Sequence, residues 1–318
     1  MPSTRSPRKG SLQYWPRKRA RRSYARIRTW FSKTTDPKPL GFAGYKVGMT
    51  HLMIKDNNER SLTKGQNINF PITIIECPPI KVASLRFYKN SVSGLHAVFD
   101  VFAENLDKEL ERKILNKKGN KITDVKDYDD VRLVVYTQPK LTGIGKKKPE
   151  VFEVHLSGEK EAKLEYAKSV LGKEIKINDV LEEGQQVDIH SVTRGKGLQG
   201  PVRRFGIGLK SHKSEKHRRT PGNLGAWTGG KMWTVAQSGK TGYYQRRDYN
   251  KWLIKIGEDK EINPKSGFPH YGVIKNQYIF VKGSVGGSQK RIIIMTNALR
   301  ENKKIPKAAP EIVYTNIN

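Results

Sequence analysis

Side chains that could perform catalysis or bind a metal ion are few in this sequence, and their spacing is unfavourable. The seven histidines lie at positions 51, 96, 155, 190, 212, 217 and 270, and none is four residues from another, as on a metal-binding helix. His212 and His217 lie in a run of Lys and Arg, where repulsion between cations opposes metal binding. The single cysteine, Cys77, excludes a disulfide framework and cysteine-based zinc sites. The sequence therefore predicts that the protein is not an enzyme and uses no metal or cofactor.

Two short motifs resemble nucleotide-binding loops but lie in the wrong context. Gly195–Gly200 matches the dinucleotide fingerprint G-x-G-x-x-G, whose glycines must open a helix that holds the pyrophosphate. Pro201 and a second Gly-x-Gly at 206–208 leave no room for a helix of useful length. Ser238–Thr241 resembles the end of a P-loop, but position 234 is threonine where that motif needs glycine. Neither motif predicts nucleotide binding.

Charge is the strongest signal, with 61 Lys and Arg against 30 Asp and Glu in 318 residues, a net charge of +31. Residues 1–40 hold 12 cations and one acid, and residues 194–256 hold 15 cations and two acids. Residues 41–193 are nearly neutral, with 24 cations and 22 acids. A basic surface gains affinity for polyanions by releasing their counterions. The sequence therefore indicates a nearly neutral body that carries two segments for binding a polyanion.

The N-terminal basic segment mixes arginine with aromatic residues and prolines. Arg17-Lys18-Arg19-Ala20-Arg21-Arg22 lies among Tyr14, Trp15, Tyr24, Trp30 and Phe31. Such a stretch buries too little apolar surface to order itself in water. Arginine pairs bidentately with phosphate, and the aromatic rings either stack on unpaired bases or anchor the segment on its own domain. A transit peptide is the alternative, although the aromatics and prolines oppose an amphipathic helix.

The central basic segment is rich in glycine, with 11 glycines in residues 194–256. Long segments without periodicity are usually functional or disordered. Because glycine lets the backbone approach another polymer closely, the mixture of Gly, Arg, Lys and isolated Trp predicts a loop that enters RNA. Two other classes stay open on these residues alone, namely a nucleic-acid-modifying enzyme and an independent DNA-binding architectural protein.

The neutral body is predicted to be mainly β, with short β-branched runs separated by Gly, Pro and Asn turns, which favours a barrel or a sandwich. No apolar run reaches the length of about 18–20 residues that a membrane span needs. Apolar stripes predict helices over 106–116 and 158–171, the second with Ser157 as N-cap and Gly172 as its stop. The expected strands are Ile68–Glu76, Val82–Tyr88, Leu95–Phe102, Val131–Thr137, Val151–Leu156, Gln186–Val192, Trp252–Ile256, Tyr278–Val281 and Arg291–Thr296.

These patterns predict four parts of the chain. Residues 1–40 form a basic N-terminal extension, and residues 41–102 with 176–318 form a discontinuous β domain. Residues 103–175 are an α/β insertion that divides the strands of the β domain. Residues 194–256 form the long Gly/Arg-rich loop.

Several long motifs, in the basic segments and in the neutral body, resemble a known family. They are Gly41–His51 (GFAGYKVGMTH), Val192–Gly206 (VTRGKGLQGPVRRFG), Gly222–Trp227 (GNLGAW), Gly239–Arg247 (GKTGYYQRR) and Val281–Gly287 (VKGSVGG). Together with Pro7–Leu12 they resemble the archaeal and eukaryotic branch of the ribosomal protein L-three family, and the similarity extends over nearly the whole chain.

The resemblance implies a fold, a function and a set of partners. The implied fold is mainly β, a split β-barrel similar to that of translation factors, with an inserted α/β region and two long basic extensions. The implied function is that of a structural constituent of the large subunit of the cytoplasmic ribosome, which binds large-subunit rRNA early in assembly. The implied partners are that rRNA, neighbouring ribosomal proteins and, indirectly, tRNA and translation factors. The loop tip, Gly225-Ala226-Trp227, is expected near the peptidyl-transferase centre, where aminoacyl-tRNA enters.

The expected rRNA-binding residues are lysines and arginines of the two basic segments, two histidines of the central segment and the tryptophan of the loop tip. They are Arg8, Lys9, Arg17, Lys18, Arg19, Arg21, Arg22, Arg194, Lys196, Arg203, Arg204, Lys210, His212, Lys213, His217, Arg218, Arg219, Trp227, Lys231, Lys240, Arg246 and Arg247.

Overall fold

The computed structural model describes residues 11–32, 35–115, 127–214, 216–225, 234–258 and 260–317. The chain divides into two compact units. One, here called the cationic unit, comprises Met1–Arg22 and Val192–Gln245. The other, the sheet unit, comprises Ser23–Ser191 and Arg246–Asn318. Within the part of the chain that is described, no helix is long and apolar enough to cross a membrane.

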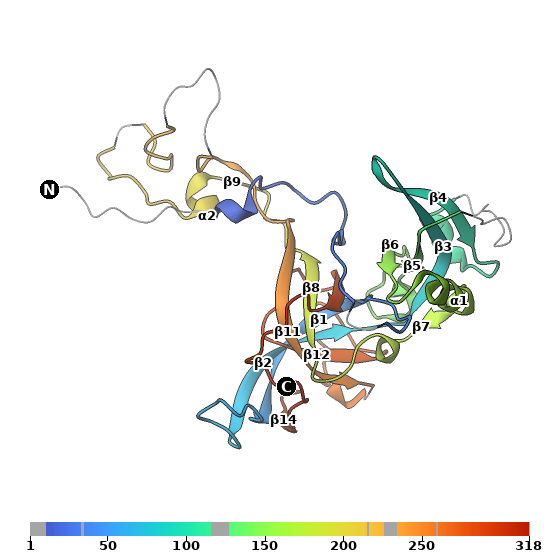
Figure 1. The fold of residues 1–318 in the computed structure, drawn as a ribbon. Helices are drawn as coiled ribbons and strands as arrows, with labels where there is room; N and C mark the ends of the chain where they lie inside the picture. Colours follow the sequence, from blue (N-terminus) through green and yellow to red (C-terminus); the bar gives the residue numbers. More distant parts are fainter. Residues whose placement is uncertain are drawn as a thin grey trace. The chain divides into compact units, whose positions relative to one another are not determined.

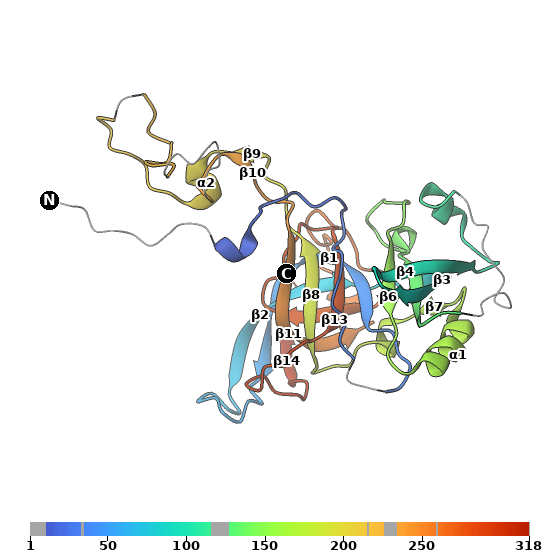
Figure 2. The same cartoon turned by 45° about the horizontal axis from the view of Figure 1, so that its top comes forward.

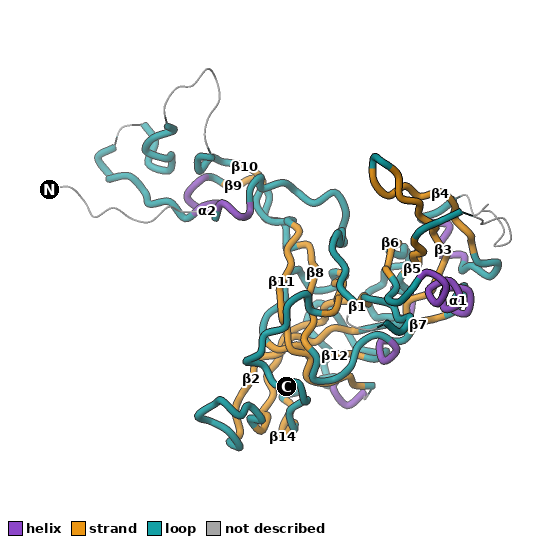
Figure 3. The backbone as a smooth tube through the Cα atoms, viewed as in Figure 1, coloured by secondary structure: helices purple, strands orange, loops and turns teal. Residues whose placement is uncertain are grey.

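The larger sheet has seven strands in the order β13-β8-β11-β12-β2-β1-β14, and β1 also pairs with β13. The six strands other than β14 are therefore connected in a ring of pairings, part of which Figure 2 shows side by side. The prediction of a mainly β protein is confirmed, and strands and loops dominate Figure 3. The bounds are β1 Gly41–Lys55, β2 Asn67–Glu76, β8 Gln186–Val192, β11 Gln245–Gly257, β12 Tyr278–Lys282, β13 Ile292–Asn297 and β14 Ile312–Thr315.

Strand β1 was not among the expected strands, because its glycines lower β-propensity. The structure shows what the glycines permit. A Cβ at Gly44 would lie 2.6 Å from Ile75 Cγ2 and 2.8 Å from the carbonyl oxygen of Glu76, both on the neighbouring strand β2. The close approach of two backbones therefore requires glycine at this position.

The smaller sheet has the order β4-β3-β5-β6, with β7 paired to β3. Helix α1, Lys160–Val170, packs against β5 in this sheet (Figure 1). Strands β3 and β4 belong here, so this sheet begins at Ile80, whereas the sequence analysis placed residues 80–102 with the discontinuous β domain. The sequence pattern predicted these segments as strands, but which sheet a strand joins depends on its pairing with residues that are distant in the sequence. The bounds are β3 Ile80–Ser91, β4 Gly94–Phe102, β5 Asp130–Tyr136, β6 Val151–His155 and β7 Glu174–Ile175.

The two predicted helices have different outcomes. The second forms as α1, and Gly172 follows it at φ +75°. Ser157 does not cap it, because its hydroxyl instead accepts a hydrogen bond from the backbone N–H of Lys38 at 2.8 Å. The first is only a 3-10 helix, Lys108–Arg112. Its apolar residues do pack, because Leu110 is fully buried against Tyr136. An apolar stripe predicts which residues are buried, but it does not determine whether the backbone forms an α-helix or a 3-10 helix.

A single hydrophobic cluster runs through both sheets of the sheet unit. Tyr45 of β1 links them by polar contacts as well, because its hydroxyl lies within hydrogen-bond distance of Thr137 Oγ1, at 2.9 Å, and of Glu150 Oε2, at 3.0 Å. All three side chains are buried, and burial raises the pKa of Tyr45 well above its ordinary value. The sheet unit is therefore one folded body with a continuous core.

Candidate nucleic-acid interface

The cationic unit contains 19 Lys and Arg and a single acidic residue, Glu215. The sheet unit carries 42 cations and 29 acids. Like charges repel one another unless counterions or a polyanion lie between them. The compact unit that contains neither of the two larger sheets is therefore also the part with almost no internal charge compensation.

A short antiparallel stem organises the cationic unit. Strand β9, Leu198–Gln199, pairs with β10, Gly239–Lys240. Next to this ladder, Lys196 N–H donates to the carbonyl of Thr241 at 2.9 Å, and Thr241 N–H donates to that of Gly197 at 2.8 Å. Residues 196–199 and 239–241 thus run side by side, and the residues between them form a single loop that is closed at its base by this ladder.

Helix α2, Pro201–Phe205, follows β9 directly. Proline at its first position has no N–H to leave unpaired, and Gly206 ends it at φ +70°. A five-residue helix agrees with the expectation that this sequence allows no long one. Arg204 Nη1 donates to the carbonyl of Gln237 at 3.1 Å, so the helix is bonded to the returning side of the stem.

The N-terminal segment is attached to the same stem. Trp15 stacks on Phe205 with ring centroids 5.7 Å apart and an interplanar angle of 18°. Arg17 Nη1 donates to the carbonyl of Arg204 at 3.2 Å, and its guanidinium lies 4.3 Å from the centroid of the Phe205 ring. The sequence left two roles open for the aromatic residues, stacking on bases and anchoring the segment on its own domain. Trp15 has the second role, because it stacks on Phe205.

A second contact fixes the segment a few residues later. The N–H of Ala20 donates to the carbonyl of Tyr243 at 2.8 Å, and the guanidinium of Arg19 lies 5.3 Å from the Tyr243 ring centroid. Phe205 and Tyr243 were not among the predicted site residues. Their sequence signal is slight, a single aromatic residue at the end of α2 and another in the run Gly242-Tyr243-Tyr244.

Replacing Trp15 with alanine should loosen the N-terminal segment from the stem. The stack with Phe205 contributes about 0.5–1.5 kcal/mol beyond burial, so trypsin should cleave within residues 17–22 several-fold faster in W15A. Digestion of the full chain followed by mass spectrometry measures this rate. Leu12→Ala is the control, because Leu12 is 53% exposed. Equal cleavage rates in W15A and the wild type would contradict the anchoring role.

Most predicted rRNA-binding residues in the described part of the chain have exposed side chains. The exposed ones are Lys18, Arg19, Arg21, Arg22, Arg194, Lys196, Arg203, His212, Lys213, His217, Arg218, Arg219 and Lys240. Arg17, Arg204, Lys210, Arg246 and Arg247 are half-buried. Gly225 is exposed at φ +91°, and its N–H donates to Asn223 Oδ1 at 2.8 Å. Arg8, Lys9, Ala226, Trp227 and Lys231 lie outside the described residues.

Two of the predicted residues, Arg246 and Arg247, lie in strand β11 of the sheet unit. Arg247 Nη2 forms an ion pair at 2.7 Å with Oδ2 of Asp188, whose side chain is 0% exposed. The same carboxylate accepts the backbone N–H groups of Asn250 at 2.9 Å and Leu299 at 3.1 Å. Arg247 therefore has a structural partner, Asp188, that the charge pattern did not reveal. Residues 245–256, the last part of the predicted loop, belong to strand β11.

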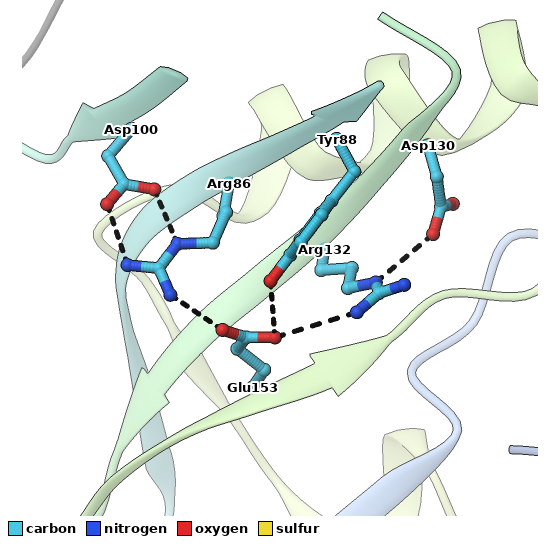
Figure 4. Close-up of polar contacts among 6 residues, drawn as sticks. All are labelled: Arg86, Tyr88, Asp100, Asp130, Arg132 and Glu153. Atoms are coloured by element: carbon cyan, nitrogen blue, oxygen red, sulfur yellow. Dashed lines mark hydrogen bonds and ion pairs between the residues drawn. The ribbon is translucent and has the colours of Figure 1, made fainter. Parts of the chain in front are cut away.

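Arginines of the smaller sheet are likewise paired with carboxylates (Figure 4). Arg86 holds Asp100 bidentately, with both N–O distances 2.7 Å, and contacts Glu153 at 2.6 Å. Tyr88 and Arg132 contact the other oxygen of Glu153 at 2.8 and 3.7 Å. Burial opposes ionisation of Glu153, but these donors lower its pKa nonetheless. This cluster is self-neutralised, in contrast to the exposed cations of the cationic unit.

The geometry of the cationic unit suits phosphate contact. Arginine presents a planar fork of donors that matches phosphate, and lysine a compact charge. Among the described residues, no group of three or more His, Cys, Asp or Glu side chains is arranged to hold a metal ion. The arrangement of exposed donors around a stem therefore suits contact with a polyanion.

Comparison with known proteins agrees with the resemblance found in the sequence. Residues 1–318 match the family described as Ribosomal protein L3. "Large ribosomal subunit protein uL3" of Archaeoglobus fulgidus is 47% identical over 93% of each chain. The proteins of the same name from Methanocaldococcus jannaschii and Methanosphaera stadtmanae are 46% and 44% identical, over 97% of this chain and 95% and 96% of theirs. The chain therefore belongs to the ribosomal protein L3 family, here of archaeal type, and is a structural protein of the large subunit of the cytoplasmic ribosome, not an enzyme.

Proposed function

We propose that this protein binds large-subunit rRNA mainly through its cationic unit. The observation that carries the proposal is the charge of that unit, 19 cations and one acid, on a stem that holds both basic segments together. Each phosphate neutralised by Lys or Arg releases counterions, which favours association. The exposed side chains named above are the proposed contacts, together with Arg8, Lys9, Trp227 and Lys231 from the sequence.

The proposal assigns a different task to each part of the chain. The sheet unit is the rigid base, a split barrel of the translation-protein type, and the ring of six paired strands supports this fold. The α/β region after β2 is the insertion. The N-terminal extension and the loop are the parts that enter rRNA, and Arg247 is reassigned from rRNA contact to holding Asp188.

Binding by two basic segments on one stem would also support early assembly of the subunit. Each segment that orders on rRNA fixes the position of the other, because both are attached to the stem through Phe205 and Tyr243. The loop tip at Gly225-Ala226-Trp227 is proposed to support the peptidyl-transferase centre and the region where aminoacyl-tRNA enters. The partners are then rRNA, neighbouring ribosomal proteins and, indirectly, tRNA and translation factors.

Removing the distal loop should separate rRNA binding from folding. Replacing residues 209–235 with a short Gly/Ser linker leaves α2, the β9–β10 ladder and all of β11 in place. The deletion removes six Lys and Arg, so the slope of log K against log[salt] for rRNA binding should fall in magnitude by about 4–5 at roughly 0.7–0.9 per lost contact. Filter binding to large-subunit rRNA at several salt concentrations measures it.

Thermal unfolding by circular dichroism is the control for this deletion. The sheet unit should unfold at the temperature of the wild type, because its core contains none of the deleted residues. An unchanged salt slope would contradict the proposed interface. A wild-type protein that binds duplex DNA as tightly as rRNA at the same salt would favour a DNA-binding protein instead.

A further inference from the structure

Strand β4 is an edge strand of the smaller sheet, and its hairpin with β3 projects from that sheet (Figure 1). It pairs with β3 on one side, and within the described part of the chain no strand pairs with its other side. The opposite edge of the sheet, at β6, is covered. Leu40 N–H donates to the carbonyl of His155, and Ser157 N–H donates to that of Lys38, both at 2.9 Å. The described chain therefore covers one edge of this sheet and leaves the other open.

The hydrogen bonds of β3 show which backbone groups of β4 face the open side. The carbonyl of Tyr88 accepts the N–H of Asp129 at 2.7 Å, and the N–H of Asn90 donates to Asp129 Oδ2 at 2.6 Å. These two residues of β3 therefore direct their backbone groups away from β4. Tyr88 lies opposite Ala97, and Asn90 lies opposite Leu95. Such residues form non-hydrogen-bonded pairs in an antiparallel ladder, so Leu95 and Ala97 direct their N–H and C=O groups to the open side.

The side chains of β4 do little to prevent pairing with another chain. Natural proteins protect open edges with lysine, proline, very short strands or bulges. Strand β4 has nine residues, none of them Lys, Arg or Pro, and the stretch Gly94–Ala97 pairs with β3 without a register shift. Leu95 and Val98 are 51% and 44% exposed. The open edge thus combines unpaired backbone groups with exposed apolar side chains, which suits the addition of a partner strand.

The charge around β4 indicates which kind of molecule fits this edge. Residues 90–107 contain three acids and no Lys or Arg, although 61 of the 318 residues of the chain are Lys or Arg. Lys89, which precedes this stretch, is paired with Asp127. A phosphate backbone would meet no cation on this strand, and a second copy would bring a further net charge of +31. These two kinds of partner are therefore disfavoured, and an extended segment of a different protein fits the edge best.

We propose that β4 receives an extended strand of another large-subunit protein, which pairs with its open edge through backbone hydrogen bonds. The partner segment has apolar side chains at alternate positions, which pack beside Leu95, and Lys or Arg where it passes the exposed Glu104. The inference rests on the proposed function only in taking a neighbouring ribosomal protein as the partner. It involves none of the proposed rRNA contacts.

Hydrogen exchange in intact large subunits tests the wild-type protein without knowledge of the partner. The open-side amides of Gly94–Phe102, followed by mass spectrometry, should exchange at least tenfold more slowly in the subunit than in the free full-length protein, because the partner strand accepts their hydrogen bonds. Equal exchange in the two states would overturn the inference. Slow exchange already in the free protein would also overturn it, since the chain itself or a second copy would then cover the edge.

Ala97→Pro separates strand addition from other kinds of cover. Ala97 is exposed, and proline there removes an N–H of the open side while leaving the hydrogen bonds to β3 in place. The matched control, Ala97→Thr, keeps this N–H. In large subunits purified from cells that carry each variant, slow exchange of Gly94–Phe102 should be lost in A97P and retained within about twofold in A97T. Wild-type protection in A97P subunits would overturn the inference, because a cover that needs no edge hydrogen bonds would then explain it.

The outcomes also separate this inference from the proposed function. Both free variants should fold, as circular dichroism checks, and should bind large-subunit rRNA with wild-type affinity in the filter assay, because β4 contains none of the proposed contacts. A tenfold loss of rRNA affinity in folded A97P would overturn the inference, since the edge would then be an rRNA contact. Failure of the wild-type protein to bind rRNA would instead overturn the proposed function, and hydrogen exchange of β4 would still decide the inference.

Discussion

Arg247→Leu should destabilise the sheet unit by about 3–5 kcal/mol, because it leaves the buried carboxylate of Asp188 without its ion pair. Asp188 would keep two backbone N–H donors, those of Asn250 and Leu299, but no cation. An uncompensated charge at a fully buried position costs several kcal/mol. At roughly 2–4 °C per kcal/mol for a unit of this size, the Tm should fall by about 6–20 °C.

Urea denaturation followed by circular dichroism measures this loss, with Arg60→Leu as the control for removing one charge. Arg60 is exposed, so its substitution should change the free energy of unfolding by about 0.5 kcal/mol or less. Asp188→Asn should also destabilise, since it leaves Arg247 partly buried and unpaired. The double variant D188N/R247L should lose less than the sum of the two single losses, because each first substitution already breaks the pair.

The same variant decides between two roles of Arg247. The charge pattern of the sequence assigns it to rRNA, while its contact at 2.7 Å with Asp188 assigns it to the fold. If R247L keeps wild-type stability but loses rRNA affinity, the sequence-based prediction is right and the structural role is wrong. If stability falls and the salt slope of rRNA binding is unchanged, Arg247 belongs to the sheet unit alone.

Arg247 also shows what charge in a sequence cannot tell. Counting cations indicated two basic segments, and the cationic unit contains residues 1–22 of the first and 194–245 of the second. The count treats every arginine alike, however, and the partner of Arg247 lies 59 residues away on another strand. Whether an arginine faces solvent or a buried acid depends on strand pairing, which no local pattern specifies.

The strands show the same limit. The run Gln186–Val192 was predicted with the bounds that β8 has, because its β-branched Val187 and Ile189 alternate with polar residues at the spacing of a strand. The run Val82–Tyr88 was likewise recognised as a strand, but the sequence did not indicate that it joins the smaller sheet. Strand β1 was missed since its glycines serve contacts with β2 that only the folded chain reveals.

For the candidate site, the sequence predicts residue types, but it does not predict how these residues are organised. The expected cations in the described part of the cationic unit are mostly exposed. The sequence left open whether Trp15 meets a base or its own domain, because Phe205, its partner, is 190 residues away. The attachment of the N-terminal segment to the stem depends on this pair and on the Ala20–Tyr243 hydrogen bond, both of them non-local.

Gly242→Ala should open this stem and lower rRNA affinity at least tenfold. Gly242 is buried at φ +72°, and a Cβ there would lie 2.1 Å from the carbonyl oxygen of Arg194 on the opposite side. That oxygen is a backbone atom and accepts a hydrogen bond from the N–H of Tyr243, so it cannot move aside as the end of a flexible side chain could. Separating the two sides would also release Ala20, whose N–H donates to the carbonyl of Tyr243. The two basic segments would then be less pre-organised for rRNA, and each loss of about 1.4 kcal/mol in binding free energy lowers rRNA affinity tenfold.

Gly197→Ala is the matched control, because it lies in the same stem, also in the left-handed region, at φ +68°, but with nothing within 4 Å of the added Cβ. Only the left-handed penalty of roughly 1–2 kcal/mol applies there. Tryptic cleavage within residues 17–22 and rRNA affinity, measured together, should both change much more in G242A than in G197A. Because the two substitutions share chemistry and backbone region, equal effects would mean that strain alone acts and that contact across the stem does not organise the two basic segments.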